Sequence, residues 1–416
     1  MIDRYKEIKQ RVMNRIDLDN DFTDEQINEI IQEEICNAAK NLPIPIRERF
    51  ALQTQVFNSL RKLDVLEDML ADEDITEIMI NGPSDIFIEK KGRVQRSTIN
   101  FVNEEKLNDV IQHIVADNNK IVNESNPIVD TRLSDGSRVN IVLPPAAVDH
   151  SVMTIRKFPL EHMTVEKLLE YGSISQEIVD FLRDLVISGY NIFISGGTGS
   201  GKTSFLNAMA EFIPCDERVI TIEDSAELQL KDIDNLVRLE ARSANLEGRN
   251  EISIRDLLKS SLRMRPDRII VGECRGGEAL EMLQAFNTGH DGSFSTGHAN
   301  SCEDMVRRLE TMVLQATEIP LVAVRQQIAS GIDLFVHLGR LRDKSRKLLE
   351  IAEVDGMENG EINYHPIYKF VETSEIDGKV VGEWRKVGNL ISVEKLQMSG
   401  LYQKYMDQQQ LELLKE

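Results

Sequence analysis

The chain has 416 residues, enough for two to four domains at roughly 100–200 residues per domain. Hydrophobic residues make up 41% and charged residues 29%, which is ordinary for a globular protein and argues against wholesale disorder. Lys and Arg number 49 against 70 Asp and Glu, and the net charge of −21 argues against a protein that coats nucleic acid non-specifically. A local basic site remains compatible with this balance.

The sequence predicts no membrane span, no targeting segment and no cysteine-based site. No apolar run approaches the roughly 18 residues of a spanning helix, and the first 20 residues are charged throughout, unlike a signal peptide. The four cysteines lie far apart without a CxxC pair, which fits neither a disulfide framework nor zinc: Cys36, Cys215, Cys274 and Cys302. We expect a reducing, cytosolic compartment.

Residues 1–64 are expected to form a helical N-terminal region. Apolar residues fall at helical spacing after Thr23, which can cap the helix: Ile27, Ile30, Ile31 and Ile35. The segment 42–45 contains two prolines and interrupts this pattern. A second amphipathic stretch follows over residues 50–66.

From residue 65 the pattern changes, and residues 65–157 are expected to form a small α+β domain. Strands are predicted at residues 77–81, 86–89 and 139–143, a helix at 106–118, and turns at 81–83, 91–92 and 134–136. Residues 158–172 are then a linker to the next domain.

Residues 173–345 alternate strands and helices, the pattern of an α/β domain with a parallel sheet. The strands are predicted at residues 191–195, 218–223, 268–271 and 293–298, and two helix starts resemble capping boxes, Ser253 with Asp256 and Ser301 with Asp304. Residues 346–416 return to short strands and turns and end in a polar helix from residue 392. We treat them as a C-terminal appendage.

The strongest functional signal follows the strand at 191–195 and satisfies the Walker A pattern G-x-x-x-x-G-K-[ST]. Its residues are Gly196, Gly197, Thr198, Gly199, Ser200, Gly201, Lys202 and Thr203. Glycines let backbone N–H groups converge on phosphate oxygens, and the following helix adds its N-terminal dipole. Lys202 is expected to meet the β- and γ-phosphates of ATP, and Thr203 to bind Mg²⁺. The alternative, a glycine-rich turn that binds nothing, fits this motif poorly.

Two predicted strands end in acids near this motif. Glu273 follows the apolar run 269–271 and Gly272, which resembles a Walker B strand, and an acid there could hold Mg²⁺ through water or polarise the attacking water. Glu223 and Asp224 end the strand at 218–223. An acidic pair is often only a solvated loop, but beside a P-loop we expect these carboxylates at the magnesium site.

A third group is the segment 289–300, which carries His290 and His298 among small residues. A zinc site would need a third ligand at suitable spacing, which the sequence does not offer. A polar sensor near the γ-phosphate fits better, because small neighbours let backbone and imidazole approach the nucleotide.

Together these segments resemble the secretion ATPases of type II secretion, type IV secretion and type IV pili. The resemblance is carried by residues 236–242, 262–268, 272–279 and the histidine segment, and upstream by residues 74–82 and 131–140. Within the superfamily the chain most resembles the CpaF-like ATPases of tight-adherence (Flp) pili. It lacks the tetracysteine zinc insertion often found in type II relatives, which favours the pilus or type IV branch.

The resemblance implies a RecA-like P-loop ATPase core and a role for each motif. Glu223 and Asp224 belong to an Asp box, and Glu273 is the Walker B glutamate that orients or deprotonates water. His290 and His298 mark a His box. Three arginines of the N-terminal domain are placed where they would reach toward the nucleotide: Arg132, Arg138 and Arg156.

The arginines also have a physical rationale. Phosphoryl transfer needs positive charge around the γ-phosphate, and Lys202 alone supplies little. Arginines from a second domain or a neighbouring subunit could supply it in a closed, assembled state, which would couple hydrolysis to domain motion. For each of these three arginines the alternative role is a surface ion pair. The same alternative applies to four arginines of the next domain, which could instead make intersubunit contacts: Arg238, Arg242, Arg263 and Arg265.

The resulting interpretation is a cytoplasmic homo-hexameric motor that hydrolyses ATP with Mg²⁺. It would bind peripherally at the inner face of the cytoplasmic membrane, through a pilus or secretion platform protein whose basic cytoplasmic loops complement the acidic chain. No nucleic-acid partner is expected. The alternatives are a RecA-like DNA-translocating motor and a nucleotide-binding scaffold without turnover.

Overall fold

The structure is a computed structural model that describes residues 2–16, 22–41, 44–90, 92–158, 163–242, 244 and 249–413. Contacts divide the chain into two compact units, residues 1–160 and 161–416, which are described separately. Four predicted features fall partly outside the described residues: the interruption at 42–43, the turn at 91, the linker at 159–162 and the helix end at 414–416. No described helix is long and apolar enough to cross a membrane.

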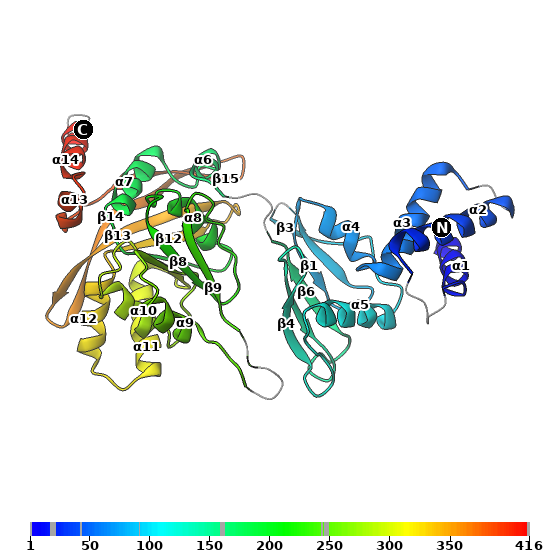
Figure 1. Cartoon of the computed structure of the whole chain (residues 1–416). Helices are drawn as coiled ribbons and strands as arrows, with labels where there is room; N and C mark the ends of the chain where they lie inside the picture. Colours follow the sequence, from blue (N-terminus) through cyan, green and yellow to red (C-terminus); the bar gives the residue numbers. More distant parts are fainter. Residues whose placement is uncertain are drawn as a thin grey trace. The chain divides into compact units, whose positions relative to one another are not determined.

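The first unit begins with three helices that share a small core of their own (Figure 1). They are α1 (Ile2–Met13), α2 (Asp24–Asn41) and α3 (Ile46–Arg61). Ile31 and Leu52 are fully buried between them, as the helical spacing of the apolar residues predicts.

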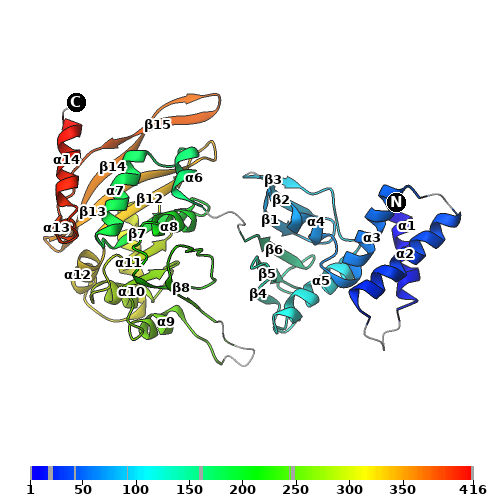
Figure 2. The ribbon, with the colours of Figure 1, turned by 45° about the horizontal axis from the view of Figure 1, so that its top comes forward.

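The rest of the first unit is an antiparallel sheet with α5 packed on one face (Figures 1 and 2). The strand order is β3-β2-β1-β6-β5-β4. Asn103 caps α5 by accepting a hydrogen bond from the Lys106 backbone N–H at 2.9 Å. The elements are α4 (Leu66–Ala71), β1 (Ile75–Ile80), β2 (Ile86–Lys90), β3 (Arg93–Arg96), α5 (Glu104–Asp117), β4 (Ile128–Arg132), β5 (Arg138–Val142) and β6 (Val152–Arg156).

The second unit is built on a nine-stranded sheet of order β15-β14-β13-β12-β7-β11-β10-β8-β9. Strands from β12 to β9 in this order pair in parallel, whereas β12 to β15 pair antiparallel. The strands are β7 (Ile192–Gly196), β8 (Arg218–Glu223), β9 (Asn235–Glu240), β10 (Arg268–Val271), β11 (Phe294–Gly297), β12 (Leu334–Arg340), β13 (Arg346–Glu358), β14 (Glu361–Ile376) and β15 (Lys379–Lys386).

Helices cover both faces of this sheet, so its central strands are buried on each side. Along β7, Ile192 and Ile194 face the core formed with α6, α7 and α8, and Phe193 faces the core formed with α10 and α11. The helices are α6 (Val165–Glu170), α7 (Gln176–Ile187), α8 (Lys202–Ala210), α9 (Ile254–Ser261), α10 (Ala279–Phe286), α11 (Cys302–Ala316), α12 (Leu321–Gly331), α13 (Glu394–Met398) and α14 (Tyr402–Leu413). The predicted fold class, an α/β core preceded by an α+β region and N-terminal helices, is confirmed.

The sheet continues across the position where the sequence suggested an appendage. β13 begins at Arg346 and pairs with β12, and β14 and β15 follow as antiparallel neighbours. The alternation of strands and helices stops there, but the apolar side chains of β13 still complete the core, with Leu348 and Ile351 fully buried. Likewise α6, inside the predicted linker, buries Val165 and Leu168 in the second unit.

Candidate active site

The P-loop connects β7 with α8 at the carboxyl edge of the parallel strands. Gly196 has φ of 157°, and a Cβ there would lie 2.5 Å from the Leu338 carbonyl oxygen and 2.6 Å from Ser200 Oγ, so only glycine fits. Ser200 Oγ is buried without a hydrogen-bond partner. An orphaned hydroxyl and a glycine-lined backbone cradle fit the phosphates of a nucleotide.

Lys202 begins α8 and turns its side chain back onto the loop. Its Nζ donates to the carbonyl oxygens of Gly196 at 3.1 Å and Gly197 at 3.2 Å, and the residue is 8% exposed. The ammonium group is therefore held over the cradle, where it can meet phosphate oxygens.

Glu273 and His298 meet beside Lys202. β11 pairs in parallel with β7, with Gly297 opposite Ser195, so His298 follows next to the P-loop. His298 Nδ1 lies 3.3 Å from Lys202 Nζ, and His298 Nε2 lies 3.0 Å from Glu273 Oε1. The histidine thus bridges the phosphate-binding lysine and the acid that follows β10.

Electrostatics in this cluster favour an ionised glutamate and a neutral histidine. Burial raises the pKa of Glu273, but the hydrogen bond from Arg275 at 2.8 Å and the charges of Arg275 and Lys202 act against burial, and the pKa is lowered. Burial and the Lys202 charge lower the pKa of His298. A neutral ring can accept from Lys202 at Nδ1, while its Nε2 lies beside Glu273 Oε1, which is buried and accepts no hydrogen bond from the residues that the structure describes.

Glu223 ends β8 and lies beside the residue that precedes Glu273. Its Oε2 accepts hydrogen bonds from the backbone N–H groups of Glu227 at 2.7 Å and Leu228 at 3.0 Å, whereas Oε1 is buried without a partner. Burial is the main cause of its raised pKa. One carboxylate oxygen therefore orders the following loop and the other is left to accept a further ligand. Asp224 is exposed.

A magnesium ion would find few protein ligands here. Among the described residues no three His, Cys, Asp or Glu side chains converge as metal ligands. Mg²⁺ typically takes most of its ligands from substrate phosphates and water. The Thr203 hydroxyl at the start of α8 and the free oxygen of Glu223 fit that sparse donor set.

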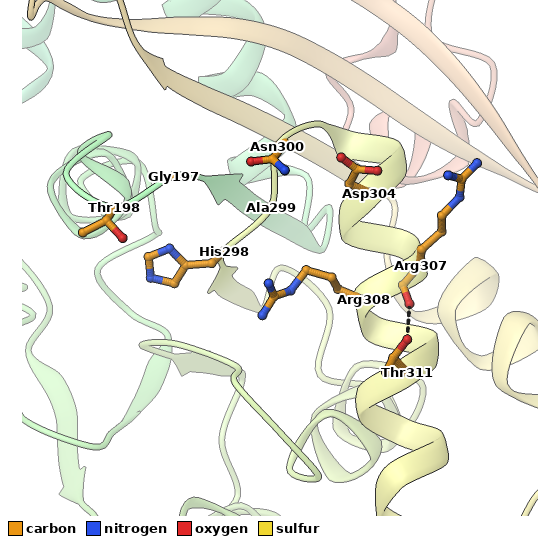
Figure 3. A pocket seen from close by; sticks show the side chains of 9 residues that line it. All are labelled: Gly197, Thr198, His298, Ala299, Asn300, Asp304, Arg307, Arg308 and Thr311. Carbon is orange, nitrogen blue, oxygen red and sulfur yellow. Dashed lines mark hydrogen bonds between the residues drawn. The ribbon is translucent and has the colours of Figure 1, made fainter.

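A pocket of about 540 Å³ opens between the P-loop and α11 (Figure 3). Its lining is Gly197, Thr198, His298, Ala299, Asn300, Asp304, Arg307, Arg308 and Thr311. The Arg308 guanidinium extends toward His298 in Figure 3, and its charge helps to lower the pKa of that histidine. Sequence reasoning missed both arginines of α11, Arg307 and Arg308, although they occur about two helical turns after the N-cap at Ser301, which follows the histidine segment.

Arg346 is a third residue that the sequence did not single out. Its Nε donates to the Gly199 carbonyl oxygen at 2.8 Å, so the start of β13 holds the tip of the P-loop. The residue lies almost 150 positions further along the chain, and nothing in its local sequence signals this contact.

The structure separates the two histidines of the predicted pair. His290 precedes β11 and its Nδ1 lies 3.0 Å from the Ala285 carbonyl oxygen, whereas His298 follows the same strand. They therefore lie at opposite ends of a strand, and His290 is not brought to the P-loop. They are eight positions apart in the sequence, and the extended strand between them keeps the two side chains apart.

The three arginines of the first unit lie side by side. In the antiparallel register Arg132 is opposite Arg138, and Arg138 is opposite Arg156, so they share one face across β4, β5 and β6. The opposite face carries the core packed against α5. Like charges in register repel one another, so this row is suited to an anionic ligand.

The arginine candidates of the second unit lie along its edge. Arg238 is exposed on the edge strand β9, and its charge tends to lower the pKa of Glu223 against the effect of burial. Arg242 donates to the Asn250 carbonyl oxygen at 3.0 Å, and Arg263 and Arg265 are exposed.

A glycine-built P-loop at the end of a central parallel strand, with a glutamate after a neighbouring strand, defines a P-loop ATPase domain. Residues 59–404 match the family model described as Type II/IV secretion system protein. The chain belongs to this family and is an ATPase.

Named relatives agree with this assignment. VirB11, a type IV secretion system protein of Brucella suis, is 33% identical over 303 residues, which cover 66% of this chain and 84% of VirB11. TrbB, a conjugal transfer protein of Rhizobium radiobacter, is 31% identical over 342 residues, which cover 78% of this chain and 99% of TrbB. The chain also resembles the crystal structure of the pilus retraction motor PilT with bound ADP, with a TM-score of 0.52 and 19% sequence identity. The match covers 84% of this chain and 89% of that chain, and it supports the fold alone.

Proposed function

We propose that the chain is an ATP-hydrolysing homo-hexameric motor that powers pilus assembly or protein secretion through a membrane-embedded platform protein. The observation that carries the proposal is the contact of His298 with both Lys202 and Glu273 beside the P-loop. The relatives VirB11 and TrbB are named for type IV secretion and conjugal transfer, and these names support a motor that works with such a machine.

In the proposed reaction, Lys202 places positive charge on the phosphates of ATP while the P-loop backbone holds them. Glu273 orients the attacking water and accepts its proton, because its lowered pKa keeps the carboxylate ionised. His298 connects these two residues. Thr203 and Glu223 would hold Mg²⁺, which neutralises charge on the phosphate oxygens when bound.

Arginines complete the proposed site. The row of Arg132, Arg138 and Arg156 offers charge for the γ-phosphate from the first unit, of the same or a neighbouring subunit. Arg238 and Arg242 are further candidates on the edge of the second unit. A site that needs charge from another unit or subunit couples hydrolysis to motion between them.

The finer assignment is a CpaF-like ATPase of a tight-adherence pilus. It is supported by residues 74–82 and 131–140, which resemble that group, and by scattered cysteines in place of a zinc insertion. Neighbouring genes for membrane platform proteins and a small pilin would support it. Genes for a conjugation or type IV secretion machine alone would contradict it.

Phosphate release by the purified full-length chain tests the proposal. We expect Mg²⁺-dependent turnover that Lys202→Ala abolishes, because the phosphates lose their charged partner. Lys231→Ala, a change of an exposed lysine in the same unit, should leave turnover unchanged. Strong stimulation by double-stranded DNA would favour the DNA-translocating motor instead, and nucleotide binding without turnover would favour the scaffold.

A further inference from the structure

His337 is a buried histidine to which the reaction above gives no role. It lies on β12 between Val336 and Leu338 and is 6% exposed. An apolar side chain would fill this position without the cost of desolvating an imidazole, so a histidine here needs hydrogen bonds on both ring nitrogens.

The ring lies close to polar groups of two different walls of the ATP site. His337 Nδ1 lies 2.9 Å from Ser195 Oγ, and the ring also hydrogen-bonds the backbone of Asn300. Ser195 immediately precedes the first glycine of the P-loop. Asn300 comes two residues after His298 and lines the pocket in Figure 3.

The backbone of the same strand strengthens the first link. In the parallel register of β12 and β7, His337 is opposite Ser195, and Leu338 is opposite Gly196. The Leu338 carbonyl oxygen is the nearest of the atoms that leave no room for a Cβ at Gly196. The entry to the P-loop is therefore set by two consecutive residues of β12.

We propose that His337 is a positioning residue for ATP hydrolysis, which holds the P-loop strand and the His298 loop at a fixed spacing without touching the nucleotide. In this arrangement the Ser195 hydroxyl donates to Nδ1, and the other ring nitrogen carries the proton and is the donor available to the Asn300 backbone. This arrangement needs a neutral ring in one tautomer. The proposal rests on the proposed function only in taking ATP turnover as the reaction.

The surroundings of the ring are consistent with that tautomer. Burial is the largest influence and lowers the pKa of His337. The charged groups around it are Glu350 on β13, Asp304 on α11 and Lys202 on α8. The two carboxylates act against burial and Lys202 acts with it, and the pKa remains lowered.

Three variants of the full-length chain test the proposal by steady-state ATP turnover and by binding of a fluorescent ATP analogue. His337→Leu removes both hydrogen bonds at similar volume, and we expect kcat to fall about ten-fold or more while ATP affinity stays within about two-fold. His337→Gln offers an acceptor and a donor and should restore most of kcat. Ser195→Ala should lower kcat, and adding it to His337→Leu should cost no more than His337→Leu alone.

Three results would each overturn the proposal. They are a folded His337→Leu chain with normal kcat, a His337→Gln chain as impaired as His337→Leu, and additive losses of kcat in the double variant. Should His337→Leu not fold, Ser195→Ala decides: lower kcat at unchanged ATP affinity supports it, and normal kcat overturns it. His113→Leu, a change of an exposed histidine in the first unit, is the control. ATP turnover that survives Lys202→Ala would refute the proposed function. If Lys202→Ala abolishes turnover but His337→Leu keeps a normal kcat, only this inference is refuted.

Discussion

At the scale of single residues, the catalytic candidates are linked into one chain of polar contacts. Lys202 meets His298, His298 meets Glu273, and Glu273 meets Arg275. Burial and Lys202 lower the pKa of His298, and against the effect of burial Arg275 and Lys202 lower the pKa of Glu273, so a substitution within this chain of contacts alters the basicity of the proposed general base.

Arg275 gives a direct test of that coupling. Its guanidinium is one of the charges that hold the pKa of Glu273 below its ordinary value, so Arg275→Ala should raise that pKa. Because the base must be ionised, the acid limb of the pH–rate profile should then move to higher pH. Profiles of kcat against pH measure the shift. Arg385→Ala, an exposed arginine of β15, should leave the profile in place, and an unmoved profile in Arg275→Ala would contradict the coupling.

Gly196 tests the fit of the P-loop against β12. An added methyl group would overlap the Leu338 carbonyl oxygen, so Gly196→Ala should lower the free energy of unfolding by about 1–3 kcal/mol and weaken nucleotide binding. Gly197→Ala is the matched control, since a Cβ there meets nothing within 4 Å. Urea unfolding compares the two. Equal stability of the two variants would argue against the close approach at Gly196.

At the scale of elements, periodicity and motifs predicted much of the fold. The strand expected at residues 191–195 is β7 within one residue, and the capping box of Ser253 and Asp256 is present at the start of α9. These features depend on neighbours in sequence. Other features depend on residues that are distant in sequence, which a local pattern does not encode. They are the order of the strands, the addition of strands β13, β14 and β15 to the sheet, and the contact of Arg346 with the P-loop.

The same distinction explains the candidate site. The Walker A motif is local, and its position was predictable. The pairing of His298 rather than His290 with Lys202 follows from the direction of β11, and the row of three arginines follows from the antiparallel register of β4, β5 and β6.

The row of Arg132, Arg138 and Arg156 can be tested directly. If it supplies charge to the γ-phosphate, Arg156→Gln should lower kcat at least about ten-fold with little change in ATP affinity, because the charge matters most in the transition state. Arg93→Gln, an exposed arginine on β3 of the same sheet, is the matched control. Turnover and binding assays separate the two effects. Equal kcat in both variants would remove the row from the proposed site.

At the scale of the whole molecule, the scarce positive charge is unevenly distributed. Residues 238–265 hold seven Lys and Arg residues against four Asp and Glu, within a chain of net charge −21. A basic segment on an acidic protein is suited to contact an acidic surface of a second copy, which the proposed hexamer requires.

We therefore expect the chain to form hexamers with ATP and Mg²⁺, and the double substitution Arg263→Glu with Arg265→Glu to shift it toward smaller species. Sedimentation velocity at several salt concentrations measures the distribution. Arg385→Glu should leave it unchanged. Hexamers that persist equally in the double variant would exclude these arginines from the interface.

In the proposed function, ATP hydrolysis at the P-loop depends on the activation of water by Glu273. Measuring ATP binding and phosphate release by the full-length Glu273→Gln chain tests it most directly, with Glu318→Gln at an exposed position as control. We expect Glu273→Gln to bind ATP normally and to release phosphate at least about a hundred-fold more slowly. Phosphate release at the normal rate by Glu273→Gln would contradict it.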